Sequence, residues 1–353
     1  MKKPMVVTGL DIGSSKIAAV TSAVSSDGHI DILAHATGDA FGIAGGMLAN
    51  LNHSIDSVSK VLTKLRSKLS KKPDEIYVNI GATDVKGARS MGMIPIALRG
   101  REIVKSDIDK SVDAASTIHL PFDREIIHKI VHSFSIDDQP WIKNPLGLYA
   151  SRLACEVYVI TANVNHIQSI YKCVNDAGYD VKGIAFTGIA DGMSLLDRET
   201  KESGAVLIDI GSSLTEVSVF IGGCLDSFDI FRFGSKDAGN DFRSITAFND
   251  IISAIGIKLS VLNKAASGDV SIILAGGFSL ADGMIEFLEE KFAHPVKMGT
   301  LKLVRGDMSG LESIRLATAI GLCAYAYEVK ASLETRLDKR LFAKVEEIFN
   351  NYF

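Results

Sequence analysis

The sequence has few of the residues that mark secreted, metal-bound or membrane-spanning proteins. Its 353 residues include only four cysteines, seven prolines and one tryptophan. The cysteines, Cys155, Cys173, Cys224 and Cys323, lie far apart and without the spacing of a metal site, so we expect reduced, packed thiols. No apolar run approaches the roughly 18 residues that a membrane span requires.

The charge balance also excludes a function. The 38 basic and 42 acidic residues give a net charge of −4. A chain without a basic excess lacks the electrostatic footprint of a nucleic-acid-binding protein, so we expect no nucleic-acid partner. The opening "MKKPMVVTGLDIG" carries no signal-peptide pattern, which predicts a cytoplasmic protein.

Short β-branched runs alternate with helical patterns, which predicts an α/β fold. One of the predicted helices starts at a capping box formed by Ser106 and Asp109. The stretch "DIGSS" occurs twice, at Asp11–Ser15 and at Asp209–Ser213, each time between an apolar run and an alternating one. The repeat predicts two related halves, with extra material between about residues 83 and 160.

Each "DIGSS" predicts a strand–turn–strand whose glycine lets backbone N–H groups converge on an anion. An aspartate at the strand end would hold Mg²⁺ through water, since Mg²⁺ keeps several waters in its coordination shell. A third stretch, "ILAGGFSL", would place glycines against a base and ribose. We therefore predict Mg²⁺ at Asp11 and Asp209, with Asp209 also as the catalytic residue. The predicted ATP-binding residues are Asp11, Gly13, Ser14, Ser15, Lys16, Asp209, Gly211, Ser212, Ser213, Gly276, Gly277 and Phe278.

Simpler interpretations stand beside this one. A single DxG after a strand is most often an ordinary tight turn, and Lys16 on its own reads equally well as a solvated strand lysine. The argument for phosphate depends on two copies in equivalent places together with the third glycine pair.

With these motifs in this order, the chain resembles the actin/Hsp70/sugar-kinase ATPase superfamily. It is more closely similar to the FtsA family of bacterial actin-like cell-division proteins. "REIIHKIVHSFSID", "IKNPLGLYASRL", "YKCVNDAGYDVKGI" and "LATAIGLCAYAYE" carry this narrower resemblance. PilM, a pilus-assembly protein, is a neighbouring family with the same fold and insertion.

The resemblance implies a duplicated actin-like (ribonuclease H-like) ATPase fold with an FtsA-type inserted subdomain. The expected parts are the first domain at 1–82 and 161–203, the insertion at 83–160, the second domain at 204–330 and a C-terminal amphipathic helix at 331–353. In that helix, an apolar face would contact the membrane through Leu337, Leu341, Phe342, Val345, Ile348 and Phe349. The alternative is a terminal helix packed on protein, because the basic residues of this segment are cancelled by acidic ones.

Two departures from the family pattern affect function. FtsA-like proteins usually have "DIGGGTTD" at the second turn, whereas here Ser212 and Ser213 replace glycines, Leu214 a threonine and Glu216 the last aspartate. The added side chains would weaken phosphate binding or hydrolysis. The segment between "GNDF" and "SIILAGG" is short and reads as a single helix, which puts binding of FtsZ in doubt.

The resemblance implies a membrane-associated division adaptor that binds ATP, self-assembles and recruits an FtsZ-type partner at the inner face of the cell membrane. It would be at most a slow ATPase. Two other functions stay open: a nucleotide-independent or PilM-like scaffold with another client, and a sugar-kinase-type phosphotransferase.

Overall fold

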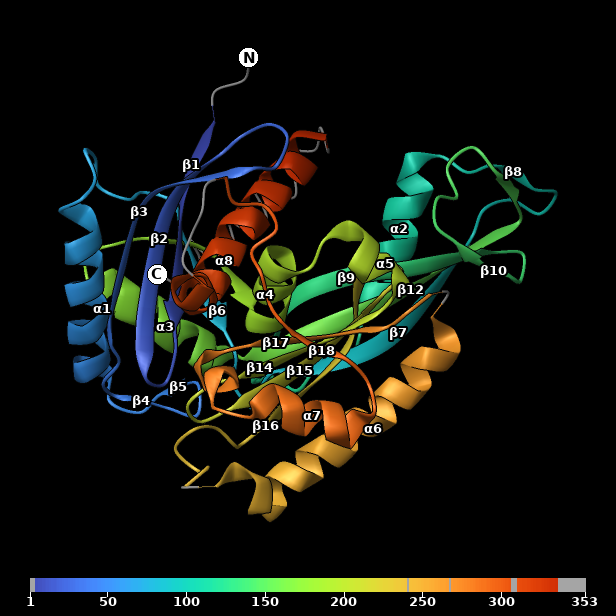
Figure 1. The fold of residues 1–353 in the computed structure, drawn as a ribbon. Helices are drawn as coiled ribbons and strands as arrows, with labels where there is room; N and C mark the ends of the chain where they lie inside the picture. Colours follow the sequence, from blue (N-terminus) through green and yellow to red (C-terminus); the bar gives the residue numbers. More distant parts are fainter. Residues whose placement is uncertain (1–3, 240, 267, 306–309, 336–353) are drawn as a thin grey trace.

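The computed structural model describes residues 4–239, 241–266, 268–305 and 310–335 (Figure 1). Two five-stranded mixed sheets form the two halves of the molecule, and a four-stranded antiparallel sheet is inserted into the first half. The α/β class and the actin-like duplication with an insertion, predicted from the sequence, are confirmed.

The first-domain sheet has the order β13-β6-β1-β2-β3. β1 pairs antiparallel with β2 and parallel with β6, and β13 continues the sheet parallel to β6. The strands are β1 (Met5–Ile12), β2 (Lys16–Val24), β3 (Ile30–Asp39), β6 (Ile76–Ile80) and β13 (Val181–Phe186).

The second-domain sheet repeats this order as β16-β15-β14-β17-β18. Its first two strands again form an antiparallel hairpin, and β17 joins parallel to β14. The strands are β14 (Ala205–Ile210), β15 (Thr215–Ile221), β16 (Cys224–Phe231), β17 (Ser271–Ala275) and β18 (Val296–Met298). Because the order and the pairing directions agree, each "DIGSS" occupies the same hairpin turn of its own sheet.

Helices cover both faces of the first sheet (Figure 1). On one face lie α1 (Leu51–Arg66) and α3 (Val164–Asp176), whose apolar positions recur at helical spacing and enter the core. On the other face lie α4 (Thr187–Leu195) and α8 (Gly310–Thr335). A Cβ on Gly321 of α8 would lie 1.8 Å from the Ala190 carbonyl oxygen of α4, so glycine is required for this close approach.

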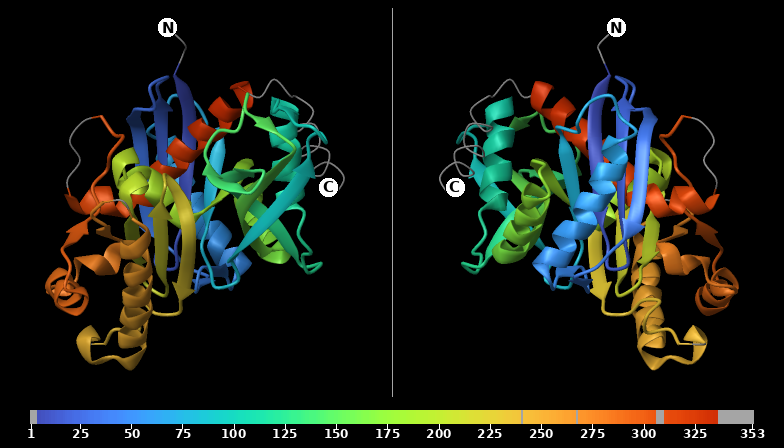
Figure 2. Two further views of the ribbon diagram at one scale, coloured as in Figure 1. Left: turned by 90° about the vertical axis from the view of Figure 1, so that its right-hand side faces the viewer. Right: turned by 90° about the vertical axis from the view of Figure 1, so that its left-hand side faces the viewer.

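The second sheet is covered by α6 (Thr246–Ala265) and α7 (Met284–Phe292), which bury Phe248, Ile255 and Phe287 against it. A single helix, preceded by the short η1 (Phe242–Ser244), occupies the described part between β16 and β17, as the sequence predicted. Figure 2 shows these helices, gold to orange, and the inserted subdomain, teal to green, on opposite sides of strands β1–β3.

The inserted subdomain is a sheet of order β10-β9-β12-β7 with one helix, α2 (Lys105–Ser116), packed on it. Its strands are β7 (Lys86–Pro95), β9 (Arg124–Ile136), β10 (Gln139–Ile142) and β12 (Arg152–Asn163). The predicted Ser106/Asp109 capping box is wrong. The helix begins earlier, because the Asp107 carboxylate accepts from the Val104 N–H at 3.0 Å and is held by Arg101 at 2.7 Å.

Six short elements complete the described chain. Two pairs of two-residue strands stand apart from the large sheets, and α5 and a 3-10 turn lie in the second half. They are β4 (Ile43–Ala44), β5 (Met47–Leu48), β8 (Arg101–Glu102), β11 (Tyr149–Ala150), α5 (Arg198–Ser203) and η2 (Gly277–Leu280).

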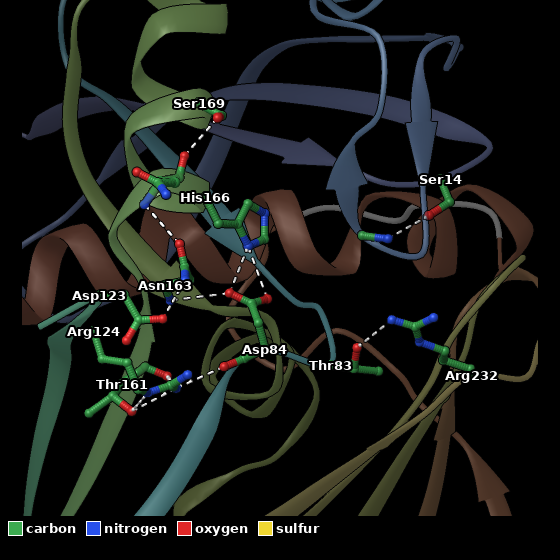
Figure 3. A network of polar contacts seen from close by, with 12 residues as sticks. Ser14, Thr83, Asp84, Asp123, Arg124, Thr161, Asn163, His166, Ser169 and Arg232 are labelled. Atoms are coloured by element: carbon green, nitrogen blue, oxygen red, sulfur yellow. Dashed lines mark hydrogen bonds and ion pairs between the residues drawn. The ribbon is translucent and has the colours of Figure 1, made fainter. Parts of the chain in front are cut away.

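A polar network fixes the base of the insertion to the first domain (Figure 3). The Asp84 carboxylate contacts His166 Nδ1 at 3.1 Å and accepts from the Asn163 N–H at 3.1 Å. The Arg124 guanidinium donates to the Asp84 carbonyl and to both oxygens of Thr161, each at 2.8 Å. Since both chain crossings between the two subdomains take part, the network sets the orientation of the insertion.

Within the described residues, no helix is both long and apolar enough to cross a bilayer. The residues predicted to contact the membrane, Leu337, Leu341, Phe342, Val345, Ile348 and Phe349, lie outside the described part of the chain.

Candidate functional site

A cleft of about 600 Å³ lies between the two halves, and both "DIGSS" turns line it. The structure brings together all of the residues predicted to bind nucleotide. The cleft is lined by Asp11, Gly13, Ser14, Ser15, Lys16, Asp209, Gly211, Ser212, Ser213, Gly276, Gly277 and Phe278.

The two turns have the same geometry. The Gly13 N–H donates to the Lys16 carbonyl at 3.0 Å, and the Gly211 N–H donates to the Leu214 carbonyl at 2.9 Å. The backbone N–H groups of the two serines in each turn have no protein acceptor in the described chain. Unpaired N–H groups in a glycine turn form an anion-binding concavity, so each turn can hold a phosphate oxygen.

Each turn is supported by a neighbouring loop. Ser14 Oγ accepts from the Gly46 N–H at 3.0 Å. In the second half, the N–H groups of Ser235 and Lys236 donate to the Gly211 and Ser212 carbonyls, each at 3.0 Å. The Lys236 ammonium reaches across the cleft to the Ser14 carbonyl at 3.5 Å and so connects the two turns.

Lys16 is not a freely solvated strand lysine. Its ammonium lies 3.3 Å from the Asp11 carboxylate and donates to the carbonyl of Arg315 on α8. Asn79, at the end of β6, donates to the other Asp11 oxygen at 3.0 Å and accepts from the Ile12 N–H at 2.7 Å. Asp11 is therefore fixed in the cleft by one amide and one ammonium group.

Three further carboxyl groups line the cleft together: Asp191 and Glu216 are buried, and Asp209 is half-buried. Burial, with the negative charge of Asp11, raises the pKa of Asp209 to about 6. Burial and the charge of Asp209 raise the pKa of Asp191 well above its usual range, and the same two causes do so for Glu216. Such a cluster needs shared protons or a bound cation.

The cluster also leaves hydrogen-bonding capacity unused. Asp191 Oδ1 accepts from the Thr318 hydroxyl at 2.8 Å, whereas its Oδ2 has no partner. Glu216 Oε2 and Ser212 Oγ are likewise buried without a partner in the described chain. A polar ligand in the cleft would satisfy these atoms.

The sequence interpretation missed Asp191, Asn79 and Thr318, and treated Glu216 only as a departure from the family pattern. Asp191 had a signal, because it is an acidic residue inside the apolar helix stretch "TGIADGMSLL". A charged residue on such a helix is rarely buried unless it is paired or functional. Asn79 had a weaker one, as a polar residue near the end of the buried strand "IYVNI".

The third predicted motif forms the wall of the cleft next to Asp209. Gly276 has a φ of +79°, and a Cβ there would lie 2.0 Å from Asp209 Oδ1 and 2.4 Å from the Ile210 carbonyl oxygen. A Cβ on Gly277 would meet no atom within 4 Å. Only glycine fits at the first position, and the second leaves an open surface on which a flat ring can lie.

The residues fit a nucleotide with its cation. Among the described residues, no group of three or more His, Cys, Asp or Glu side chains comes together as metal ligands. Mg²⁺ commonly takes only one or two protein carboxylates and completes its shell with water and phosphate. Asp11 and Asp209 could supply those carboxylates, and the ion would neutralise their charge.

Comparison with protein families and curated proteins agrees with the sequence resemblance. Residues 82–161 match the family described as the SHS2 domain inserted in FtsA. Cell division protein FtsA of Pseudomonas aeruginosa is 25% identical over 91% of this chain and 89% of its own length. The FtsA proteins of Borreliella burgdorferi and Escherichia coli K12 are each 26% identical, over 91% and 96% of this chain and 91% and 94% of their own lengths.

Solved structures share the fold at low sequence identity. The PilM-PilN type IV pilus biogenesis complex superposes with a TM-score of 0.64 and 14% identity, covering 91% of this chain and 98% of that chain. MreB 5 of Spiroplasma citri bound to AMPPNP superposes with a TM-score of 0.50 and 9% identity, over 95% and 100% of the two chains. These likenesses show an actin-like fold.

Proposed function

We propose that this chain, whose actin-like fold and inserted subdomain are similar to those of the FtsA cell-division proteins, is an ATP-binding, membrane-associated division adaptor. The observation that carries the proposal is the pair of equivalent glycine turns facing one cleft with unpaired N–H groups. Nucleotide bound by an actin-like neighbour, the AMPPNP complex of MreB 5, supports the same ligand class.

In this proposal the two halves hold one polyphosphate between them. Gly13, Ser14, Ser15 and Lys16 would bind it from the first half, and Gly211, Ser212 and Ser213 from the second. The adenine and ribose would lie against Gly276, Gly277 and Phe278. Mg²⁺ would be held by Asp11 and Asp209, and Asp209 would also position water if ATP is hydrolysed.

ATP would act mainly as a ligand that stabilises the closed arrangement of the halves and so favours self-assembly. The amphipathic C-terminal segment would place the protein at the inner face of the membrane. An FtsZ-type protein is the proposed client. Only η1 and α6 occupy the described part between β16 and β17, so the client would have to bind a smaller second domain than FtsA relatives usually offer.

The test of the site is Asp209→Ala, measured by titration with a fluorescent ATP analogue in Mg²⁺. We expect at least a tenfold loss of affinity, since the variant lacks one of the two proposed cation ligands. Asp176→Ala is the matched control, because this aspartate is exposed on α3 and forms an ion pair with Lys172 within the same helix. Unchanged binding by Asp209→Ala would rule out the assigned role.

A second candidate function rests on the serines of the second turn. Ser212 and Ser213 add side chains where the family usually has glycine, and the PilM complex shares the fold. A scaffold that no longer needs nucleotide would show no increase in melting temperature with Mg·ATP. A ligand that binds only the folded state must raise that temperature, so a clear increase excludes this alternative.

A further inference from the structure

One end of the first-domain sheet forms a groove of about 1090 Å³, here called the sheet-end groove. It is lined by the start of β1, by residues 69–75 that follow α1, and by the last turns of α8. Val6 and Leu33 in this groove are 48% and 50% exposed. Two large apolar side chains in one half-exposed groove indicate a surface that another segment covers.

The floor of the groove follows from strand geometry. Val7 faces α8, so its neighbour Val6 faces the side of the sheet on which α1 lies. α1 ends at Arg66 and leaves this end of the sheet open. Leu33 is the extra residue of a β-bulge, because Thr21 pairs with Ala34 and the next residue pairs with Ile32.

The end of α8 lies at the mouth of the groove. The Tyr327 hydroxyl donates to the Ser26 carbonyl at 2.8 Å, and the Lys330 ammonium lies 3.8 Å from Glu75. Ala331 lines the groove, and α8 is described for only four residues more. At 1.5 Å per residue, the following segment therefore starts about 8 Å along the helix from Ala331. Figure 1 shows this end of α8 and the N-terminal end of β1 at the same end of the molecule.

We propose that residues 336–353 of the same chain dock in the sheet-end groove through the apolar face formed by Leu337, Leu341, Val345 and Ile348. As a helix, these 18 residues would be about 27 Å long. The segment mixes four basic with three acidic residues, and the groove is lined by charges of both signs, Lys71 and Lys72 with Asp74 and Glu75. A mixed rim complements such a segment better than a uniformly anionic lipid surface does.

Docking and membrane contact exclude each other, because both use the same apolar face. The docked state keeps the protein off the membrane, and release of the segment permits attachment. This consequence for attachment rests on the membrane part of the proposed function, whereas the docking itself does not.

The test uses the full chain and amide hydrogen exchange of residues 336–353. We expect protection in the wild type that falls at least tenfold in Leu33→Glu and in Val6→Glu, because a charge in the groove opposes apolar docking. Ile257→Glu is the matched control, since Ile257 on α6 is 67% exposed and lies in the second domain. It should leave the protection unchanged.

Three results overturn the proposal. The first is exchange of residues 336–353 at unprotected rates in the wild type, and the second is protection that survives both groove variants. The third is protection that falls when the protein is diluted, which would assign the docked segment to a second copy of the chain. Sedimentation with vesicles of phosphatidylcholine mixed with the anionic lipid phosphatidylglycerol separates docking from membrane attachment, because a basic segment binds an anionic surface. Stronger pelleting of the groove variants supports docking with attachment. Groove-dependent protection without any pelleting supports docking and refutes the membrane proposal.

Discussion

Replacing Asp209 with asparagine should stabilise the protein in the absence of nucleotide. Burial and the Asp11 charge raise the pKa of Asp209 from 3.8 to about 6, which means that its ionised form is disfavoured in the folded state. Each pKa unit corresponds to about 1.4 kcal/mol, so ionised Asp209 costs about 3 kcal/mol of unfolding free energy at neutral pH. Asparagine cannot ionise, and its amide can donate to the neighbouring Asp191 carboxyl.

The pH dependence gives the sign of the effect. At pH values below 3.8 the carboxyl is neutral in both the folded and the unfolded chain, so the two proteins should be equally stable. Between pH 3.8 and about 6 the unfolded chain releases the proton first, and the wild type loses stability relative to the variant. By this reasoning about half of the difference is present at pH 5 and all of it at pH 7.5.

Urea unfolding at pH 5 and pH 7.5 measures the difference directly, and at pH 7.5 the melting temperature should rise by about 5 °C. Mg·ATP should stabilise the wild type more than Asp209→Asn, since the cation favours the ionised carboxylate. A variant that is less stable than the wild type at pH 7.5, or a difference in stability that does not change with pH, would refute the raised pKa of the Asp209 carboxyl.

Three other substitutions test the cleft and the base of the insertion. Gly276→Ala should weaken ATP-analogue binding at least tenfold and lower the melting temperature, because the new Cβ would occupy the place of the Asp209 carboxylate; a normal titration would contradict this. Asp84→Ala should reduce the unfolding free energy in urea by about 2 kcal/mol, since it removes a partly buried charged acceptor from the base of the insertion. A change below about 0.5 kcal/mol, the size of an ordinary surface substitution, would contradict the network. Thr318→Val should lower the unfolding free energy by about 1–3 kcal/mol by leaving Asp191 Oδ1 unpartnered, with an unaltered urea midpoint as the contrary result.

Much of the fold could be predicted from the sequence because its signals are local. The two "DIGSS" hairpins are encoded by apolar runs, a glycine and the alternation that follows, and the helix between β16 and β17 by apolar spacing alone. The cleft could be predicted because a repeated motif implies repeated geometry. The glycine pair at Gly276–Gly277 was placed by its position after a buried strand.

What the sequence could not supply depends on contacts between distant segments. The N-cap of α2 is Val104 and not the predicted Ser106, because Arg101, outside the helix, fixes the Asp107 carboxylate that accepts from the Val104 N–H. Gly321 lets α8 approach α4 closely. This approach brings Thr318 of α8 within hydrogen-bonding distance of the Asp191 carboxyl on α4. No local pattern encodes such a meeting of two helices.

The central claim is that the two turns hold one nucleotide between them, and calorimetric titration of the wild-type chain with Mg·ATP tests it most directly. The account predicts one ATP per chain and loss of binding when either turn is altered, by Gly13→Val in the first half or Gly211→Val in the second. Absence of binding by the wild type, or binding that survives alteration of one of the two turns, would contradict it.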